Sequence, residues 1–235
     1  SAQRQCKRRK KMNILVLNGS PKEKSDTMIL TRAFLKGLEK TGNHNIKIID
    51  VIKKNIAPCR GCFGCWQIQN GQCVIKDDQN EILQLYPKAD LIIWSFPLYC
   101  FGMPSHLKAV LDRTIPLIQK KMEDTGDGTH HLSAVDFSKI HALVICGCGF
   151  PNYEHNFEGV QRQCELAFGN LTQVFVPETP LLNIPEAEPV TKPKRESFER
   201  AGEEYGKTFA LKTETIAELQ SLMIPKDEYI NGVNS

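Results

Sequence analysis

Four cysteines with the spacing C-x2-C-x2-C-x7-C lie close together in the chain, at Cys59, Cys62, Cys65 and Cys73. Thiolates two residues apart in a glycine-containing loop can converge on one metal centre. Four soft sulfur ligands suit an iron–sulfur cluster or a zinc ion, and the spacing alone does not choose between them. Free or transiently oxidised thiols are a third interpretation. The segment is therefore a candidate metal or redox site with three alternatives open.

A second group of reactive side chains occupies the loop 19–27, which leads into a helical pattern. Hydroxyl groups of Ser20, Ser25 and Thr27, the charge of Lys22 and the free N–H groups of a helix start favour binding of a phosphate. The loop matches neither the Gly-x-Gly-x-x-Gly pattern of dinucleotide-binding folds nor the Gly-x-x-x-x-Gly-Lys-Ser/Thr pattern of nucleotide hydrolases. An ordinary helix N-cap is the alternative interpretation.

Two further loops contain groups suited to a flat ligand. One loop gathers aromatic and soft side chains in the run Pro97, Leu98, Tyr99, Cys100, Phe101, Gly102 and Met103. The other contains two glycines, which permit close approach of the backbone to a ligand, in the run Cys146, Gly147, Cys148 and Gly149. Local packing is the alternative for the side chains of the first loop.

Short apolar runs alternate with helical patterns, and these elements must position the loops. Runs typical of buried strands cover residues 13–18, 46–51, 90–95, 140–146 and 173–176. Helical spacing of apolar residues occurs in 26–40, after Asp78, and in 105–115, 154–168 and 195–211. The alternation predicts a doubly wound parallel α/β sheet. Ligands of such sheets bind beyond the carboxyl ends of the strands, where the three loops are expected to meet.

Several of these segments resemble one known family. The run Leu17–Lys22, the segment Pro58–Cys65, the Asp77–Asp78 pair and the run Ser95–Tyr99 are similar to NAD(P)H-dependent FMN reductases of the flavodoxin superfamily, especially to its iron–sulfur flavoprotein branch. The resemblance covers residues 12–150 clearly and the remainder in outline. It implies a flavodoxin-like, five-stranded parallel sheet of order 2-1-3-4-5 with helices on both faces.

The same resemblance implies FMN as the cofactor and NAD(P)H as the co-substrate. The FMN phosphate would be held by Ser20, Lys22, Ser25 and Thr27, and the ring by residues 97–103 and 146–150. If a [4Fe–4S] cluster forms, its ligands would be the four cysteines of the first paragraph, while free thiols and zinc stay open. Homo-oligomers, dimers or higher, are common among the relatives.

The expected activity is an oxidoreduction carried out by the flavin ring itself, so no obligate catalytic side chain is predicted. Tyr99 and Phe101 are expected to wall the ring, and a polar loop at 123–131 to cover it. Electrons would pass from NAD(P)H to a small-molecule or protein acceptor, such as a flavin, a quinone or a nitro or azo aromatic. The alternatives are a non-enzymatic flavodoxin/iron–sulfur electron carrier and a cysteine-loop protein that senses redox state or metals.

Length and composition predict one folded domain. The chain has 235 residues, 41% hydrophobic and 24% charged, and residues 12–235 are interpreted as a single FMN-binding domain. Within it, the prolines of residues 177–235 predict an extended connector before the C-terminal helices. Residues 1–11 are interpreted as a basic tail, disordered or left over from expression.

The charge distribution argues against nucleic acid as a partner. Six of the 30 basic residues precede Met12, so the remaining chain has 24 basic and 27 acidic residues and is mildly acidic. No apolar run approaches the roughly 18 residues of a transmembrane helix, so no membrane association is expected. Nine cysteines without a signal peptide indicate reduced thiols and a cytoplasmic location.

Overall fold

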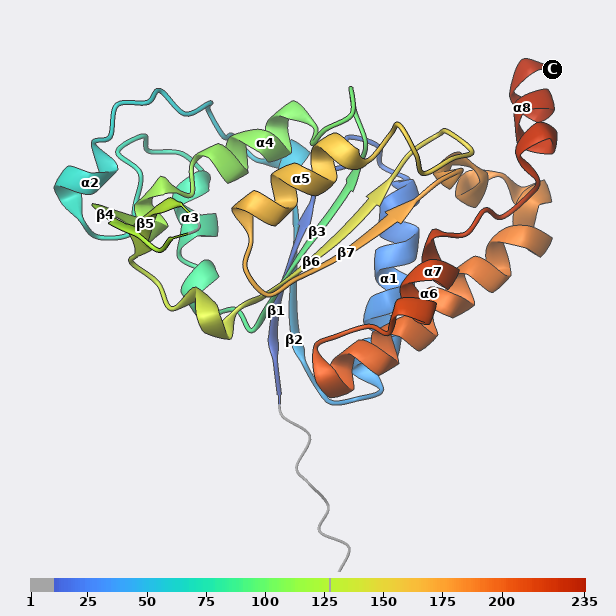
Figure 1. Ribbon diagram of the computed structural model, residues 1–235, viewed down its shortest axis with the longest axis horizontal. Helices are drawn as coiled ribbons and strands as arrows, with labels where there is room; N and C mark the ends of the chain where they lie inside the picture. Colours follow the sequence, from blue (N-terminus) through green and yellow to red (C-terminus); the bar gives the residue numbers. More distant parts are fainter. Residues whose placement is uncertain (1–10, 127) are drawn as a thin grey trace, which may run out of the picture.

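The computed structural model describes residues 11–126 and 128–235. Its centre is a five-stranded parallel sheet with the strand order β2-β1-β3-β6-β7 (Figure 1). The strands are β1 (Asn13–Asn18), β2 (Asn45–Asp50), β3 (Leu91–Pro97), β6 (His141–Gly147) and β7 (Leu171–Val176). Since β6 and β7 are the fourth and fifth strands of this sheet along the chain, the predicted order 2-1-3-4-5 is confirmed.

One face of the sheet is covered by α1 (Asp26–Glu39), α6 (Glu188–Thr208) and α7 (Thr213–Gln220) (Figure 1). Successive strand side chains point to opposite faces, so Ile14 and Val16 pack here, beneath α1. Helices α1 and α6 approach closely at Gly202, where a Cβ atom would lie 1.9 Å from the carbonyl oxygen of Phe34. Glycine is required at this crossing because the two backbones leave no space for a side chain.

The opposite face is covered by α3 (Gln79–Leu83), α4 (Ser105–Asp112) and α5 (Glu158–Ala167). Leu15 and Leu17 of β1 point to this side and join a core with Leu107 and Val110 of α4. Cys164 of α5 is fully buried in the same core, where it serves as a small apolar side chain. Burial on both faces explains why the inner strands β1, β3 and β6 are nearly continuous apolar runs.

The expected polar loop at 123–131 is instead part of an antiparallel hairpin, β4 (Ile118–Asp124) and β5 (Thr129–Ser133). The hairpin packs beside α2 (Cys65–Ile68), to which it is joined by a 3.0 Å hydrogen bond from Trp66 Nε1 to the Ile118 carbonyl. Figure 1 shows β4, β5 and α2 together, away from the carboxyl ends of the sheet strands. The expectation of a loop here is therefore wrong, whereas the expectation that this segment covers the ring stays a prediction.

The proline-containing segment after β7 is not extended. Residues 179–187 form the short 3-10 helices η5 (Thr179–Asn183) and η6 (Pro185–Ala187), and α6 then includes both Pro189 and Pro193. Pro189 lies in the first helical turn, where a missing N–H costs nothing. Pro193 lies in the second turn, and the buried face of α6 offsets its lost hydrogen bond.

The chain ends in α8 (Lys226–Asn234), which projects beyond α6 and α7 (Figure 1). None of the helices in residues 11–126 and 128–235 combines the length and apolar character needed to cross a membrane. Of the predicted basic tail, residues 1–10 lie outside the described residues.

Candidate functional site

The loop between β1 and α1 places its hydroxyl groups at the start of α1. Ser25 is the N-cap, and its Oγ accepts a 3.1 Å hydrogen bond from the Met28 amide. Its Oγ also lies 3.1 Å from Thr27 Oγ1. Lys22 is exposed and lies 3.1 Å from Asp26, so its ammonium group stands at the same helix end. The N-cap interpretation holds, and the next amides of the helix start remain available to an anion because they have no intrahelical partner.

Three loops meet at the carboxyl edge of the sheet. The Gly19 amide donates to the Ser95 carbonyl at 2.8 Å, and the Leu98 amide donates to the Gly147 carbonyl at 2.7 Å. A Cβ atom at Gly147 would lie 3.0 Å from Thr27 Cγ2, which shows how closely the loop after β6 approaches α1. We call the loops 19–27, 97–103 and 146–150 together the flavin edge.

The loop after β3 ends in a tight turn that exposes two aromatic rings. Tyr99 and Gly102 exchange two backbone hydrogen bonds of 3.0 Å, and the residues between them, Cys100 and Phe101, have φ angles of 46° and 61°. Left-handed backbone at a residue other than glycine costs of order 1–3 kcal/mol. The turn keeps Tyr99 and Phe101 44% and 56% exposed, whereas a relaxed loop could fold them onto the core.

Not every predicted ring-binding side chain points outward. Met103 is buried, and Leu98 packs against the core under α4. Cys146 is fully buried in the same core, so it can reach a ligand only through its backbone. Burial raises the pKa of Cys148 to about 11, and its thiol is 3.6 Å from the Phe150 carbonyl. Both thiols of this loop therefore stay protonated and act in packing.

Sequence patterns did not indicate three side chains that complete the flavin edge. His106, at the start of α4, lies 2.8 Å from the Gly19 carbonyl through Nε2. Asn183 of η5 hydrogen bonds to the Lys24 carbonyl at 3.2 Å. Tyr229 of α8 donates from its hydroxyl to the Gly149 carbonyl at 2.8 Å. These contacts come from distant parts of the chain, so no local pattern could have revealed them.

The four clustered cysteines line one cavity, which we call the cysteine cavity, together with Arg113 from the end of α4. Gly61 and Phe63 adopt left-handed backbone angles of 62° and 51°, which turn the loop between the first three cysteines. Cys59 and Cys62 are exposed, Cys65 is buried and Cys73 is half-buried, and all four are free thiols. Burial raises the pKa of Cys65, and the neighbouring Cys73 and Cys62 add to this effect.

The cysteine cavity has the donor chemistry of an iron–sulfur site. Four cysteines of one segment line this cavity, and four cysteine thiolates are the ligand set of an iron–sulfur cluster. Among residues 11–126 and 128–235, no three cysteine, histidine or acidic side chains are close enough to share a single metal ion. The same four-cysteine ligand set serves structural zinc sites, so the cluster, zinc and free thiols all stay open at this point.

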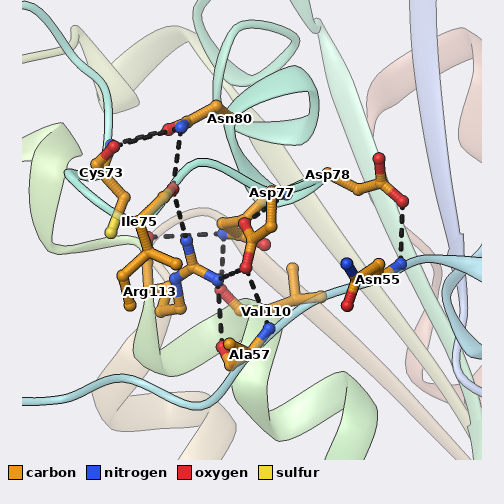
Figure 2. Close-up of polar contacts among 10 residues, drawn as sticks. Asn55, Ala57, Cys73, Ile75, Asp77, Asp78, Asn80, Val110 and Arg113 are labelled. Carbon is orange, nitrogen blue, oxygen red and sulfur yellow. Dashed lines mark hydrogen bonds and ion pairs between the residues drawn. The ribbon is translucent and has the colours of Figure 1, made fainter.

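A buried polar network holds the cysteine segment against α3 and α4 (Figure 2). Arg113 Nη1 and Asp77 Oδ2 form an ion pair of 2.5 Å, with both side chains almost completely buried. Asp77 also accepts the Ala57 amide at 2.9 Å. Asn80 accepts the Cys73 amide at 2.7 Å and donates to the Cys73 carbonyl at 3.1 Å. Both ends of the cysteine segment are thereby anchored by side chains.

Helix α4 joins the two sites. His106 lies in its first turn at the flavin edge, and Arg113 follows its last residue at the cysteine cavity. At 1.5 Å per residue, the eight residues of α4 span about 12 Å.

Comparison with known proteins agrees with this architecture. The family model described as the flavodoxin-like fold matches residues 12–175. The chain belongs to this family. Within the flavodoxin-like fold family, it belongs to the branch of the iron–sulfur flavoproteins.

Several relatives carry that name, and two of them serve as examples. An iron–sulfur flavoprotein of Methanosarcina thermophila is 31% identical over 151 residues, which are 58% of this chain and 78% of the relative. An iron–sulfur flavoprotein of Methanocaldococcus jannaschii is 29% identical over 165 residues, which are 64% of this chain and 84% of the relative.

Many solved structures share this flavodoxin-like fold, and two of them serve as examples. An NAD(P)H:quinone oxidoreductase from Methanothermobacter marburgensis aligns with a TM-score of 0.59 and 17% identity, covering 86% of this chain and all of that one. An FMN-dependent NADH-azoreductase from Bacillus anthracis, in complex with FMN, aligns with a TM-score of 0.58 and 19% identity, covering 85% and 100% of the two chains.

Proposed function

We propose that this protein is an FMN-dependent oxidoreductase that takes electrons from NAD(P)H and passes them to a small-molecule acceptor, such as a quinone or an azo aromatic. The observation that carries the proposal is the meeting of three loops at the carboxyl edge of the sheet, with an anion-binding helix start beside two exposed rings. The relatives and fold neighbours include proteins described as FMN-dependent NADH:quinone oxidoreductase and NADH-azoreductase, which supports the same chemistry.

The phosphate of FMN would be held at the start of α1. Ser20, Ser25 and Thr27 supply hydroxyl groups, Lys22 supplies a positive charge, and the helix start supplies N–H groups. The ring would lie against Tyr99 and Phe101 and the backbone of residues 146–150. When bound, FMN accepts a hydride and can release electrons singly or in pairs. The side chains orient it and exclude water from one side of the ring.

We further propose that Cys59, Cys62, Cys65 and Cys73 hold a [4Fe–4S] cluster as a second centre. Support comes from their common cavity and from the names of the archaeal relatives. The cluster, when present, stores one electron. Helix α4, about 12 Å long, would connect the residues that hold the two centres.

The test of the function is an absorption spectrum of anaerobically purified protein, with iron, sulfide and zinc assays and titrations with NADH and NADPH. A flavin spectrum that NAD(P)H bleaches, with iron and sulfide present, is the expected result. Bound flavin that neither nucleotide reduces would favour the electron-carrier alternative. Protein that does not retain FMN after reconstitution would refute the proposal. If such protein also contains zinc, the metal-sensing alternative is favoured.

Two lysine variants at opposite ends of α1 test whether the FMN phosphate binds at the start of this helix. Replacement of Lys22 by alanine is expected to weaken FMN binding about tenfold, because a charge-assisted hydrogen bond is lost. Lys36→Ala removes the same charge from the other end of α1 and is expected to leave the dissociation constant unchanged. Equal weakening in both variants would mean that only the net charge matters.

The cluster ligands are tested in the same way. Cys65→Ser is expected to abolish stoichiometric iron and sulfide while FMN is retained. Cys100→Ser changes an exposed free cysteine outside the cysteine cavity and is expected to keep the full iron and sulfide content. Full iron content in the Cys65 variant would exclude that residue as a ligand.

We also propose a homo-oligomer in the cytoplasm. Large apolar side chains are exposed close to both sites, namely Phe63, Phe101 and Phe150. All cysteines in the described part of the chain are free, as reducing conditions would keep them. Light scattering should give a multiple of the 26.5 kDa chain mass, and the mass of one chain would refute the oligomer.

A further inference from the structure

Arg113 is the most deeply buried charged side chain beside the cysteine cavity. Its side chain is 0% exposed, and Nη1 pairs with Asp77 at 2.5 Å and donates to the Ala57 carbonyl at 3.0 Å. Nη2 donates to the Ile75 carbonyl at 3.3 Å. The third nitrogen, Nε, is buried without a hydrogen-bond partner. A buried donor without a partner costs about 1–3 kcal/mol, so Nε is the donor of this side chain that can bind a further acceptor.

The cysteine cavity lies next to this guanidinium. Arg113 lines the cavity with the four cysteines, and Figure 2 shows the Cys73 sulfur on the side of Arg113. An arginine guanidinium is not deprotonated in proteins, and the Asp77 carboxylate beside Nη1 favours its charged form. The side chain therefore carries a positive charge, shielded from water, at the wall of the cavity.

A structural role alone does not require an arginine here. Replacing a buried ion pair by well-packed apolar residues is often neutral or stabilising, so the pair is weak evidence for stability. By contrast, a positive charge and an N–H donor near cluster sulfurs act directly on the cluster. Hydrogen bonds to the sulfurs, the local charge and solvent exposure all set the reduction potential of iron–sulfur centres.

We propose that Arg113 is a positioning residue that donates a hydrogen bond from Nε to a cysteine sulfur of the cavity, foremost that of Cys73, and thereby raises the reduction potential of the cluster. This inference rests on the proposed [4Fe–4S] cluster. Reduction adds one negative charge to the cluster, and the fixed guanidinium stabilises that charge in a medium of low dielectric constant. Asp77 holds the guanidinium in place through its ion pair with Nη1.

Arg60 provides a matched control on the same cavity. It also lines the cysteine cavity, but it is exposed, so water screens its charge. If the effect depends on a buried charge, replacing Arg113 changes the reduction potential of the cluster, whereas replacing Arg60 does not.

The experiment is a redox titration of the anaerobically reconstituted full-length protein, in which electron paramagnetic resonance monitors the reduction of the cluster. Iron and sulfide are assayed in every variant. Arg113→Gln is combined with Asp77→Asn, so that no unpaired charge is buried. We expect a more negative cluster midpoint potential in this double variant. Arg113→Lys keeps the charge but not the Nε donor, and a smaller shift in the same direction is expected. Arg60→Gln should match the wild type.

Either Arg113 variant with full iron content and the wild-type potential overturns the inference. If the double variant does not fold, which thermal unfolding reports, Arg113→Lys decides the question alone. Measurements on the wild-type protein test the proposed function separately. Absence of iron and sulfide there refutes both the cluster and this role of Arg113, whereas bleaching of FMN by NAD(P)H shows whether the reductase proposal stands.

Discussion

At the flavin edge, backbone hydrogen bonds between strand ends hold the loops, whereas around the cysteine cavity side chains do so. The first arrangement extends the parallel sheet itself, through pairs such as Leu98 and Gly147. The second lies outside the sheet and depends on the Arg113–Asp77 pair and on Asn80. A site held by the sheet tolerates side-chain changes better than a site held by one buried ion pair. The following experiments compare the two.

The largest effect is expected for Asp77→Ala. The change leaves the Arg113 guanidinium buried without its counter-ion, which typically costs 3–5 kcal/mol. We expect the free energy of unfolding to fall by about 4 kcal/mol in urea denaturation, and the cysteine segment to become accessible to proteases.

Asp78→Ala is the matched control. Asp78 accepts one exposed hydrogen bond, from the Asn55 amide at 2.8 Å, so its loss should cost about 1 kcal/mol or less. Equal losses for the two neighbouring aspartates would show that the ion pair does not organise the cysteine cavity.

At the flavin edge, Gly147→Ala tests the close approach of the loops. The new Cβ atom would lie 2.5 Å from Thr179 Cγ2 and 3.0 Å from Thr27 Cγ2, and such overpacking typically costs 1–3 kcal/mol. We expect a loss of about 2 kcal/mol in unfolding free energy and weaker FMN binding in a fluorescence titration. Gly149→Ala places its Cβ atom no nearer than 3.5 Å to another residue and should behave like the wild type.

The two regions also differ in their response to pH. The pKa of Cys148 is raised by burial from 9.0 to about 11, so its contribution to stability is complete below pH 9 and is lost as the pH rises toward 11. We expect the stability advantage of the wild type over Cys148→Ala to shrink by about 2 kcal/mol across this range.

Asp77 responds in the opposite direction. Burial alone would raise its pKa, but hydrogen bonds from Arg113 and two backbone amides lower it, so its contribution is lost as the pH falls through the lowered pKa. Denaturation curves at acidic and alkaline pH separate the two effects. A constant difference between wild type and Cys148→Ala from pH 8 to 11 would contradict the first.

The smallest effect is expected at the strained turn. Cys100→Gly relieves the left-handed backbone at residue 100 and should raise the unfolding free energy by up to about 1 kcal/mol. Cys100→Ala keeps the strain and should bring no gain. A gain in the alanine variant would assign the effect to the thiol and not to the backbone.

The sheet and the flavin-edge loops could be predicted because they follow local rules. Strand-length apolar runs alternate with helical patterns, and the topology then brings the loops after β1, β3 and β6 to one edge. The clustered cysteines were also visible, because ligand spacing within one loop is a local property. In contrast, the partnership of Arg113 with Asp77 spans 36 residues and involves two side chains that are usually exposed.

The remaining differences have similar causes. The β4–β5 hairpin has polar, largely exposed strands, and its contact with Trp66 joins it to a distant segment. Pro189 and Pro193 suggested extended chain, yet burial of Phe198 and Tyr205 keeps α6 helical. Tertiary packing decided both, and no single stretch of sequence contains that information.

Helix α4 fixes both the distance between His106 and Arg113 and the angle between them around the helix axis. Each residue of an α-helix turns the following chain by about 100°, so one residue inserted between His106 and Arg113 would swing the guanidinium away from Asp77 and the cysteine cavity. Removing one residue would swing it in the opposite sense. The number of residues in α4 therefore fixes how the flavin edge is rotated relative to the cysteine cavity, so a change in this number alters the geometry of both sites together.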